Sequence, residues 1–204
     1  MLTHIRHSEK VFIMKRLLLI LILAFSFQSW TKANDISDFE IEGMSIGDSL
    51  LDLVTKSDIE KKKDFKHPNK KYFQYIYLNK KNTNYDYFQF AIMDKDKNYI
   101  IEGVTGGMYF HDNIRGCLKK MDEVIEDVSK TFSDLEQTKK NVRKHRADPS
   151  EKTIITEIYF NFSTGDVIAI QCTDYSETLN YYDQLSIKLV SSKYFNWMTD
   201  EAYE

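Results

Sequence analysis

The sequence predicts an α+β fold in which an antiparallel sheet of about six strands is covered by one long amphipathic helix. Two observations lead to this class. Short runs of aromatic and β-branched residues alternate with polar turns, which is typical of half-buried strands. One longer segment carries an apolar stripe at helical spacing over about five turns. We also expect a short helix near the start of the folded domain.

The N-terminal segment has the three parts of a secretory signal peptide. Lys15 and Arg16 precede an unbroken apolar run of eleven residues, 17–27, and a polar stretch then ends at Ala33. A membrane-spanning helix needs about 20 apolar residues, so this run favours a cleaved signal, and an uncleaved N-terminal anchor is the alternative. We therefore predict that residues 1–33 are a signal peptide, with cleavage after Ala33 and no stable membrane insertion afterwards.

Met14 is an alternative start of the protein, because Met14-Lys15-Arg16 alone would form the basic region of a signal peptide. From either start, the expected product is a single exported domain, 34–204, in the periplasm or outside the cell. Removing residues 1–33 takes away five basic and one acidic side chain and leaves 23 basic and 30 acidic ones. A net charge of about −7 argues against a general nucleic-acid or anionic-membrane binder, which needs a basic surface.

The expected domain begins with a short helix over residues 45–54. Ser45 is its predicted N-cap, and Asp48 is the acidic member of a capping box. The apolar residues recur on one helix face: Ile46, Leu50, Leu51 and Val54. The charged stretch that follows, 56–71, predicts a fraying helix end and a loop.

Three strands are expected next, and two features mark the connections between them. The polar residues 94–98 predict a hairpin turn. Gly106-Gly107 predicts a bulge, a bend or a close approach of another chain segment. The three strand candidates are 72–78, 85–93 and 99–110.

The long helix is predicted over residues 114–135, with Asp112 or Asn113 as its N-cap. Spacings of three and four residues place its apolar side chains on one stripe. These side chains are Ile114, Leu118, Met121, Ile125, Val128 and Phe132.

A polar, locally basic connector over 136–152 leads to the second half of the domain. Residues 163–165 predict a hairpin turn, and residues 194–198 predict a short helix or a packed end. The strand candidates of this half are 153–162, 166–173 and 185–190. The similar segments 87–90 and 159–162 each open a hairpin, so a duplicated hairpin unit remains an alternative for the two three-strand halves.

Cys117 and Cys172 are the only two cysteines, and an isolated pair in an exported protein is most simply a disulfide. Cys117 lies at the edge of the helical stripe. Cys172 shares a strand face with Ile168 and Ile170, because side chains alternate along a strand. Both thiols therefore point into the interface between helix and sheet. Two buried free thiols are the alternative, and redox catalysis lacks a C-x-x-C pair.

The residues Gly47-Asp48-Ser49-Leu50 resemble the motif of the GDSL hydrolases. In that family the serine is the nucleophile, and the resemblance implies a later G-x-N-D block and a C-terminal D-x-x-H that supplies the base. This chain has no G-x-N-D, and residues 146–204 contain no histidine. Its D-x-x-H, residues 64–67, lies in the charged stretch. We interpret the four letters as a chance match and predict no catalytic residue.

No metal site or cofactor site is predicted. Residues 94–98 have the spacing that opens a calcium loop, but Tyr99 stands where that loop needs glycine and Thr105 where it needs glutamate. We interpret them as the tip of a hairpin. The histidines of the expected mature chain share no ligand-like spacing: His67, His111 and His145.

Residues 42–45, followed by an apolar helix and consecutive strands, resemble the opening of small periplasmic envelope-assembly domains of the BamE type. The resemblance implies association with the cell envelope. The chain lacks the lipobox cysteine of those domains, and the helix 114–135 with its three further strands has no counterpart there. Because the sequence offers no set of nucleophile and base and no set of metal ligands, we expect a non-catalytic binding or envelope-associated module for a protein or a small ligand. The alternative is a hydrolase with an unconventional site near 106–112 or in the basic connector.

Overall fold

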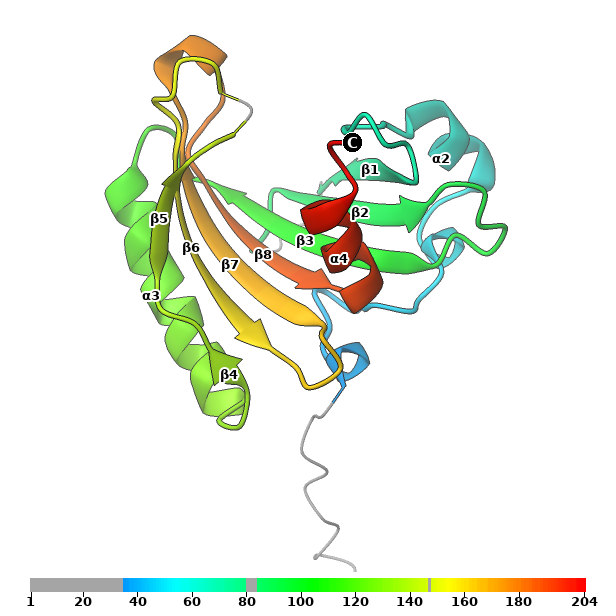
Figure 1. The fold of residues 1–204 in the computed structure, drawn as a ribbon, viewed down its shortest axis with the longest axis horizontal. Coiled ribbons are helices and arrows are strands. Elements are labelled where there is room, and N and C mark those ends of the chain that lie inside the picture. Colours follow the sequence, from blue (N-terminus) through cyan, green and yellow to red (C-terminus); the bar gives the residue numbers. More distant parts are fainter. Residues whose placement is uncertain (1–34, 80–83, 147) are drawn as a thin grey trace, which may run out of the picture. The chain divides into compact units, whose positions relative to one another are not determined.

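The strands of the chain form one antiparallel sheet (Figure 1). The structure, a computed structural model, describes residues 35–79, 84–146 and 148–204. Within these residues the strands are β1 Tyr72–Leu78, β2 Tyr87–Met93, β3 Ile101–Tyr109, β4 Glu136–Gln137, β5 Asn141–Lys144, β6 Ile154–Asn161, β7 Val167–Asp174 and β8 Gln184–Val190. Their order is β1-β2-β3-β8-β7-β6-β4, and β5 also pairs with β6. The predicted signal peptide and its cleavage after Ala33 lie outside the described residues.

The predicted α+β class is confirmed, and the sheet is larger than the six strands expected. The two predicted halves meet where β3 pairs with β8, over seven residue pairs. The additional strands β4 and β5 lie in the segment 136–152, where a polar connector was expected. Both run along the outer edge of β6, and most of their side chains are exposed. An exposed edge strand buries little surface, so it needs no apolar alternation that the sequence would reveal.

Among the described residues, three α-helices accompany the sheet: α2 Lys56–Lys62, α3 Ile114–Thr131 and α4 Ser192–Asp200. The long predicted helix is confirmed as α3, and of its two candidate N-caps Asn113 is the one used. The Asn113 side chain accepts a hydrogen bond of 3.0 Å from the backbone N–H of Gly116. The helix ends four residues earlier than predicted, and Phe132 beyond it packs its ring against Phe39 at 4.2 Å.

The helix predicted over residues 45–54 is wrong. The structure has only a short 3₁₀ turn there, η2 Leu50–Asp52, and Gly47 has a φ of 93° that an α-helix excludes. The backbone of this segment bonds instead to residues at the start of β3: Gly47 N–H donates to Ile101 C=O at 3.0 Å, and Leu50 N–H donates to Tyr99 C=O at 3.0 Å. The short helix expected in this part of the domain begins later, as α2.

The sheet buries an apolar face, here called the helix face, because successive side chains of a strand point to opposite sides. α3 packs on this face over β7 and β8. The N-terminal segment and α2 cover the other half of it with Ile36, Ile41, Leu50 and Ile59. The buried strand residues of the helix face are Phe73, Tyr75, Phe88, Phe90, Ile92, Ile101, Val104, Ile158, Phe160, Ile168, Ile170, Cys172, Leu185, Ile187 and Leu189.

Gly106 and Gly107 leave room for two tyrosine rings, one on each face of the sheet. A Cβ at Gly106 would meet the ring of Tyr85, and a Cβ at Gly107 would meet the ring of Tyr87. Of the three reasons predicted for this glycine pair, the close approach of another chain segment is therefore confirmed, here by the two tyrosine rings. The irregular register lies elsewhere, between Ala91 and Ile92 on β2.

The helix α4 packs on the face of the sheet opposite to α3, and Figure 1 shows it in front of β3. Its Tyr194 and Trp197 form a small second core with Tyr72 and Ala91. Tyr194 lies against Gly103 of β3, where an added Cβ would stand 3.1 Å from the ring and the ring would have to shift. The predicted short C-terminal helix is thus present, with two residues more at each end than the predicted 194–198.

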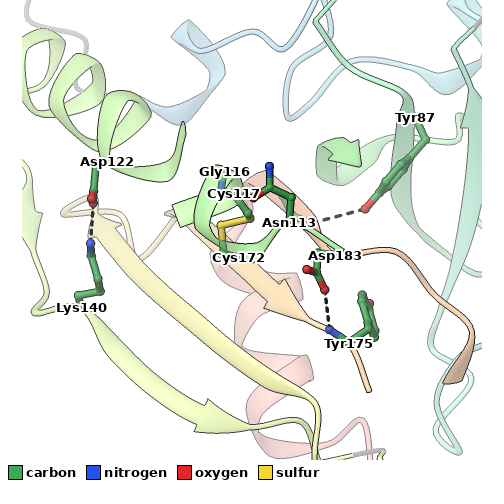
Figure 2. Close-up of a disulfide and its surroundings, with 10 residues drawn as sticks. Tyr87, Asn113, Gly116, Cys117, Asp122, Lys140, Cys172, Tyr175 and Asp183 are labelled. Carbon is green, nitrogen blue, oxygen red and sulfur yellow. Dashed lines mark hydrogen bonds and ion pairs between the residues drawn. A yellow bond between two sulfur atoms is a disulfide. The ribbon is translucent and has the colours of Figure 1, made fainter. Parts of the chain in front are cut away.

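The predicted disulfide between Cys117 and Cys172 is confirmed (Figure 2). It ties the first turn of α3 to β7 across a Cα–Cα distance of 6.0 Å, and both residues are fully buried. The sequence separation of 55 residues means that the bond connects the two halves of the chain. A disulfide is typical of proteins that reside in an oxidising compartment.

Candidate functional site

The second face of the sheet carries a group of polar side chains that we call the polar face. Strand register places these side chains on one side, since residues directly opposite each other in antiparallel strands point the same way. No helix that the structure describes has its main packing contacts on the β6–β7 part of this side. The polar face comprises Gln89, Thr105, Asn141, Arg143, Glu157, Tyr159, Gln171, Thr173, Gln184, Ser186 and Lys188.

Glu157 on β6 lies at the centre of the polar face, and only 4% of its side chain is exposed. Its carboxylate accepts two hydrogen bonds from Arg143, from Nε at 2.8 Å and from Nη2 at 2.9 Å. Gln171 Nε2 donates to the same carboxylate at 2.8 Å, and Asn141 Nδ2 donates at 3.3 Å. Burial acts to raise the pKa of Glu157, but the hydrogen bonds and charge of Arg143 outweigh it and lower the pKa.

Lys188 on β8 extends this network toward the middle of the sheet. Its Nζ donates a hydrogen bond to Gln171 Oε1, and the amide of Gln171 thereby connects Lys188 to Glu157. Among the described residues no carboxylate lies within 4.0 Å of the Lys188 ammonium. Burial lowers the pKa of Lys188 to about 8, and the nearby charge of Arg143 acts in the same direction, whereas Glu157 opposes it.

The charges of the polar face do not cancel. Arg143 and Glu157 neutralise each other through their paired hydrogen bonds, and the ammonium of Lys188 remains as an additional positive charge. His145, at the end of β5, adds no compensating negative charge; burial and the charges of Arg143 and Lys188 lower its pKa. A partly buried cation without a contacting anion is costly for the folded protein.

Tyrosine rings border the polar face at the C-terminal end of β3. The Tyr87 hydroxyl donates to Gln184 Oε1 at 3.0 Å, and Gln184 Nε2 donates to the Tyr175 hydroxyl at 3.1 Å. The ring of Tyr109 packs against Tyr87 at 5.4 Å and against Tyr182 at 5.9 Å. Tyr109 and Tyr182 are exposed, so this border offers rings to solvent beside polar groups.

The basic connector predicted from the sequence divides between two roles. Arg143 reaches into the polar face, as described above. Lys140 pairs with Asp122 of α3 at 2.5 Å, as Figure 2 shows, and Lys144 pairs with Glu151 at 2.6 Å, both on the exposed surface. Exposed pairs of this kind contribute little to stability.

The esterase-like residues lie away from the polar face, beside a surface hollow of about 460 Å³. The Ser49 hydroxyl donates to the backbone carbonyl of Asn98 at 2.6 Å, and Ser49 also caps η2. The hollow is lined by four carboxylates and by no histidine: Glu40, Glu42, Asp48 and Asp52. This geometry gives Ser49 a structural role as a cap and a cross-link to the β2–β3 connection.

The region 106–112, considered above for a hydrolase, forms the end of β3 and a turn. His111 and Asp112 both have positive φ values, 42° and 60°, and they lead the chain into the N-cap of α3. The His111 ring packs against Tyr182 at 4.4 Å. The residues 94–98 form the predicted hairpin tip, where the Asp96 carboxylate accepts backbone hydrogen bonds from Asn98 and Ile100.

Within residues 35–79, 84–146 and 148–204, no group of three or more His, Cys, Asp and Glu side chains is arranged to hold a metal ion. None of the helices in these ranges is both long and apolar enough to cross a membrane.

Glu157, Gln171 and Lys188 were not among the predicted site residues, although each leaves a signal in the sequence. Each is a charged or amide residue within a run that is otherwise apolar, aromatic or β-branched: Glu157 in TIITEIYF, Gln171 in VIAIQCT and Lys188 in LSIKLV. Because side chains alternate along a strand, the sequence shows which neighbours in its own strand each of them shares a side with. Only the order and register of the strands place all three on one face of the sheet. Comparison of the chain with protein-family models, with curated protein sequences and with solved structures found no match.

Proposed function

We propose that the chain is a non-catalytic binding domain, exported to the periplasm or secreted, which binds a small ligand on the polar face. The observation that carries this proposal is the partly buried Glu157–Arg143–Gln171–Lys188 network, on the side of the sheet where α4 has its main contacts with β3 and not with β6 and β7. Replacing a buried ion pair with packed apolar residues is often neutral or stabilising, so folding alone gives little reason to retain one. In small-ligand sites, a few polar groups held in fixed positions beside aromatic rings orient the ligand.

Export is supported by the signal-like segment 1–33 and by the disulfide, which forms and persists in oxidising compartments. The test is to express the full chain in a bacterium, to fractionate the cells and to determine the mass of the exported protein. We expect a mature N-terminus at Asn34 and alkylation of Cys117 and Cys172 only after reduction. A full-length chain in the cytoplasm with both thiols free would overturn the proposal of export.

Binding is tested on the exported protein by calorimetric melting with a panel of neutral saccharides, small carboxylates and phosphate esters. A ligand that binds the folded state raises the melting temperature by mass action. We expect at least one class to do so, and Glu157→Gln to reduce that rise. Glu151→Gln, at a side chain that is 69% exposed, is the matched control and should leave the rise unchanged. An equal response of wild type and Glu157→Gln would place the binding site elsewhere.

A further inference from the structure

We propose that the polar face binds the anionic group of a small ligand, a carboxylate or a phosphate, and that Lys188 is its charged contact. This inference rests on the proposed function, because it names the chemistry of the ligand that the same face takes.

The charge balance of the network is the first support. The Glu157 carboxylate accepts four hydrogen bonds. Two come from Arg143 and form a bidentate pair, one comes from Gln171 and one from Asn141. The ammonium of Lys188 makes one hydrogen bond among the described residues, to an amide oxygen. An ammonium has three N–H donors, so two remain for a ligand.

The neighbours of Lys188 in the sheet are the second support. Its direct partner on β7 is Ala169, and its direct partner on β3 is Thr105. The side chain of Ala169 has no hydrogen-bond acceptor, so it cannot accept from the Lys188 ammonium. Thr105 carries a hydroxyl on the same side and is paired in register with Gln89, so donors for further ligand oxygens stand in the same row.

The position of Lys188 favours a small ligand over a polyanionic surface. Its side chain is partly buried in the middle of the sheet, with strands on both sides. The expected mature chain carries a net charge of about −7, which repels nucleic acid and anionic membranes at long range. A carboxylate or phosphate on a small molecule approaches such a site more easily than an extended polyanion.

The experiment is an NMR titration of the exported protein with sodium acetate and with sodium phosphate as probes, at ionic strength held constant with sodium chloride. Lysine labelled at the carbon that bears the amino group reports the pKa of Lys188, and Lys188→Met assigns its signal. Bound anion favours the charged amine, so we expect saturable shifts and a rise in the Lys188 pKa from about 8. A rise of about one unit corresponds to about tenfold tighter binding to the charged form.

Two variants complete the test. Lys188→Met should lose the saturable shifts of the polar-face amides, whereas Lys193→Met, which removes a lysine whose side chain is 73% exposed, should retain them. If Lys188→Met fails to fold, the lysine signal that titrates near a pKa of about 8 is assigned to Lys188, and the wild-type titration decides the matter. A response to acetate alone identifies a carboxylate ligand, and a response to phosphate alone identifies a phosphoryl group.

The outcomes separate this inference from the proposed function. If a neutral saccharide shifts the signals of Gln171 and Asn141 while acetate and phosphate do not move Lys188, the anion site is overturned and the binding domain stands. If neither the anions nor the panel of ligands shifts any polar-face signal, both are overturned. Linear, unsaturable shifts of Lys188 with either salt also contradict an anion site.

Discussion

Arg143 of β5 and Glu157 of β6 form a bidentate pair across the outer edge of the sheet, with N–O distances of 2.8 Å and 2.9 Å. The two residues differ in exposure: the Glu157 side chain is 4% exposed, whereas the Arg143 side chain is 37% exposed. The arginine therefore lies over the carboxylate and supplies the charge that its buried position requires. The pair also attaches the short edge strand β5 to the rest of the sheet.

Arg143→Met should destabilise the fold, because it leaves the buried carboxylate of Glu157 without its cation. We expect a loss of about 2–3 kcal/mol in the free energy of unfolding, less than for a fully buried pair because Arg143 is partly exposed. Urea denaturation measures the loss. Lys144→Met, which breaks the exposed pair with Glu151, is the matched control and should cost less than about 1 kcal/mol. Equal losses for both variants would contradict the assigned role of Arg143.

Removing the disulfide with Cys117→Ala and Cys172→Ala should destabilise the chain by about 4 kcal/mol, since the bond closes a loop of 55 residues in the unfolded state. Chemical denaturation of the wild-type protein with and without reductant gives an independent measurement. The reduced wild type and the double variant should have similar stability. A stability independent of reductant would contradict a contribution from this bond.

Gly107→Ala should destabilise the fold by about 1–3 kcal/mol, because its methyl group would collide with the ring of Tyr87. The same substitution in a Tyr87→Ser background should cost much less, since the ring is then absent. A double-mutant cycle from thermal denaturation yields this difference as a coupling energy. Additive effects of the two substitutions would show that the glycine is required for another reason.

His67 should make the folded protein less stable under mildly acidic conditions. Its ring packs against Trp197 at 5.3 Å and against Tyr203 at 5.0 Å, and burial lowers its pKa in the folded state below the ordinary value of 6.5. The unfolded chain then binds the proton more readily than the folded one. The stabilising contribution is complete above pH 6.5 and is lost as the pH falls from there through the folded pKa.

The measurement for His67 is the free energy of unfolding between about pH 7.5 and 5.5, above the range in which carboxylates titrate. His67→Phe keeps a ring in the contact and should show a smaller decrease with falling pH than the wild type. Burial also lowers the pKa of His145, so part of the decrease should remain. Tyr203→Phe is the matched control, because it alters the same contact without removing a histidine. If the free energy of unfolding of His67→Phe decreased with falling pH as steeply as that of the wild type, the prediction would be contradicted.

Local patterns in the sequence predicted most of the elements. The apolar stripe of α3 and the strand runs are periodic over enough residues to identify the element type. Cys117 and Cys172 were predicted to bond because each lies on the apolar side of its own element. A helix was wrongly predicted over residues 45–54 because the apolar residues there have helical spacing. The backbone of this segment instead forms hydrogen bonds with the start of β3. A long-range pairing of this kind leaves no periodic signal in the segment itself.

The sequence by itself determined the α+β class, the long helix, the six main strands and the disulfide, because local propensity, alternation and side-chain periodicity act within single segments. Only the tertiary structure decided that β3 pairs with β8, that β4 and β5 extend the sheet, and that Arg143, Glu157, Gln171 and Lys188 form one network. These four residues come from four strands. Their proximity depends on strand order and register, and the free energy that selects an order comes from packing between distant segments.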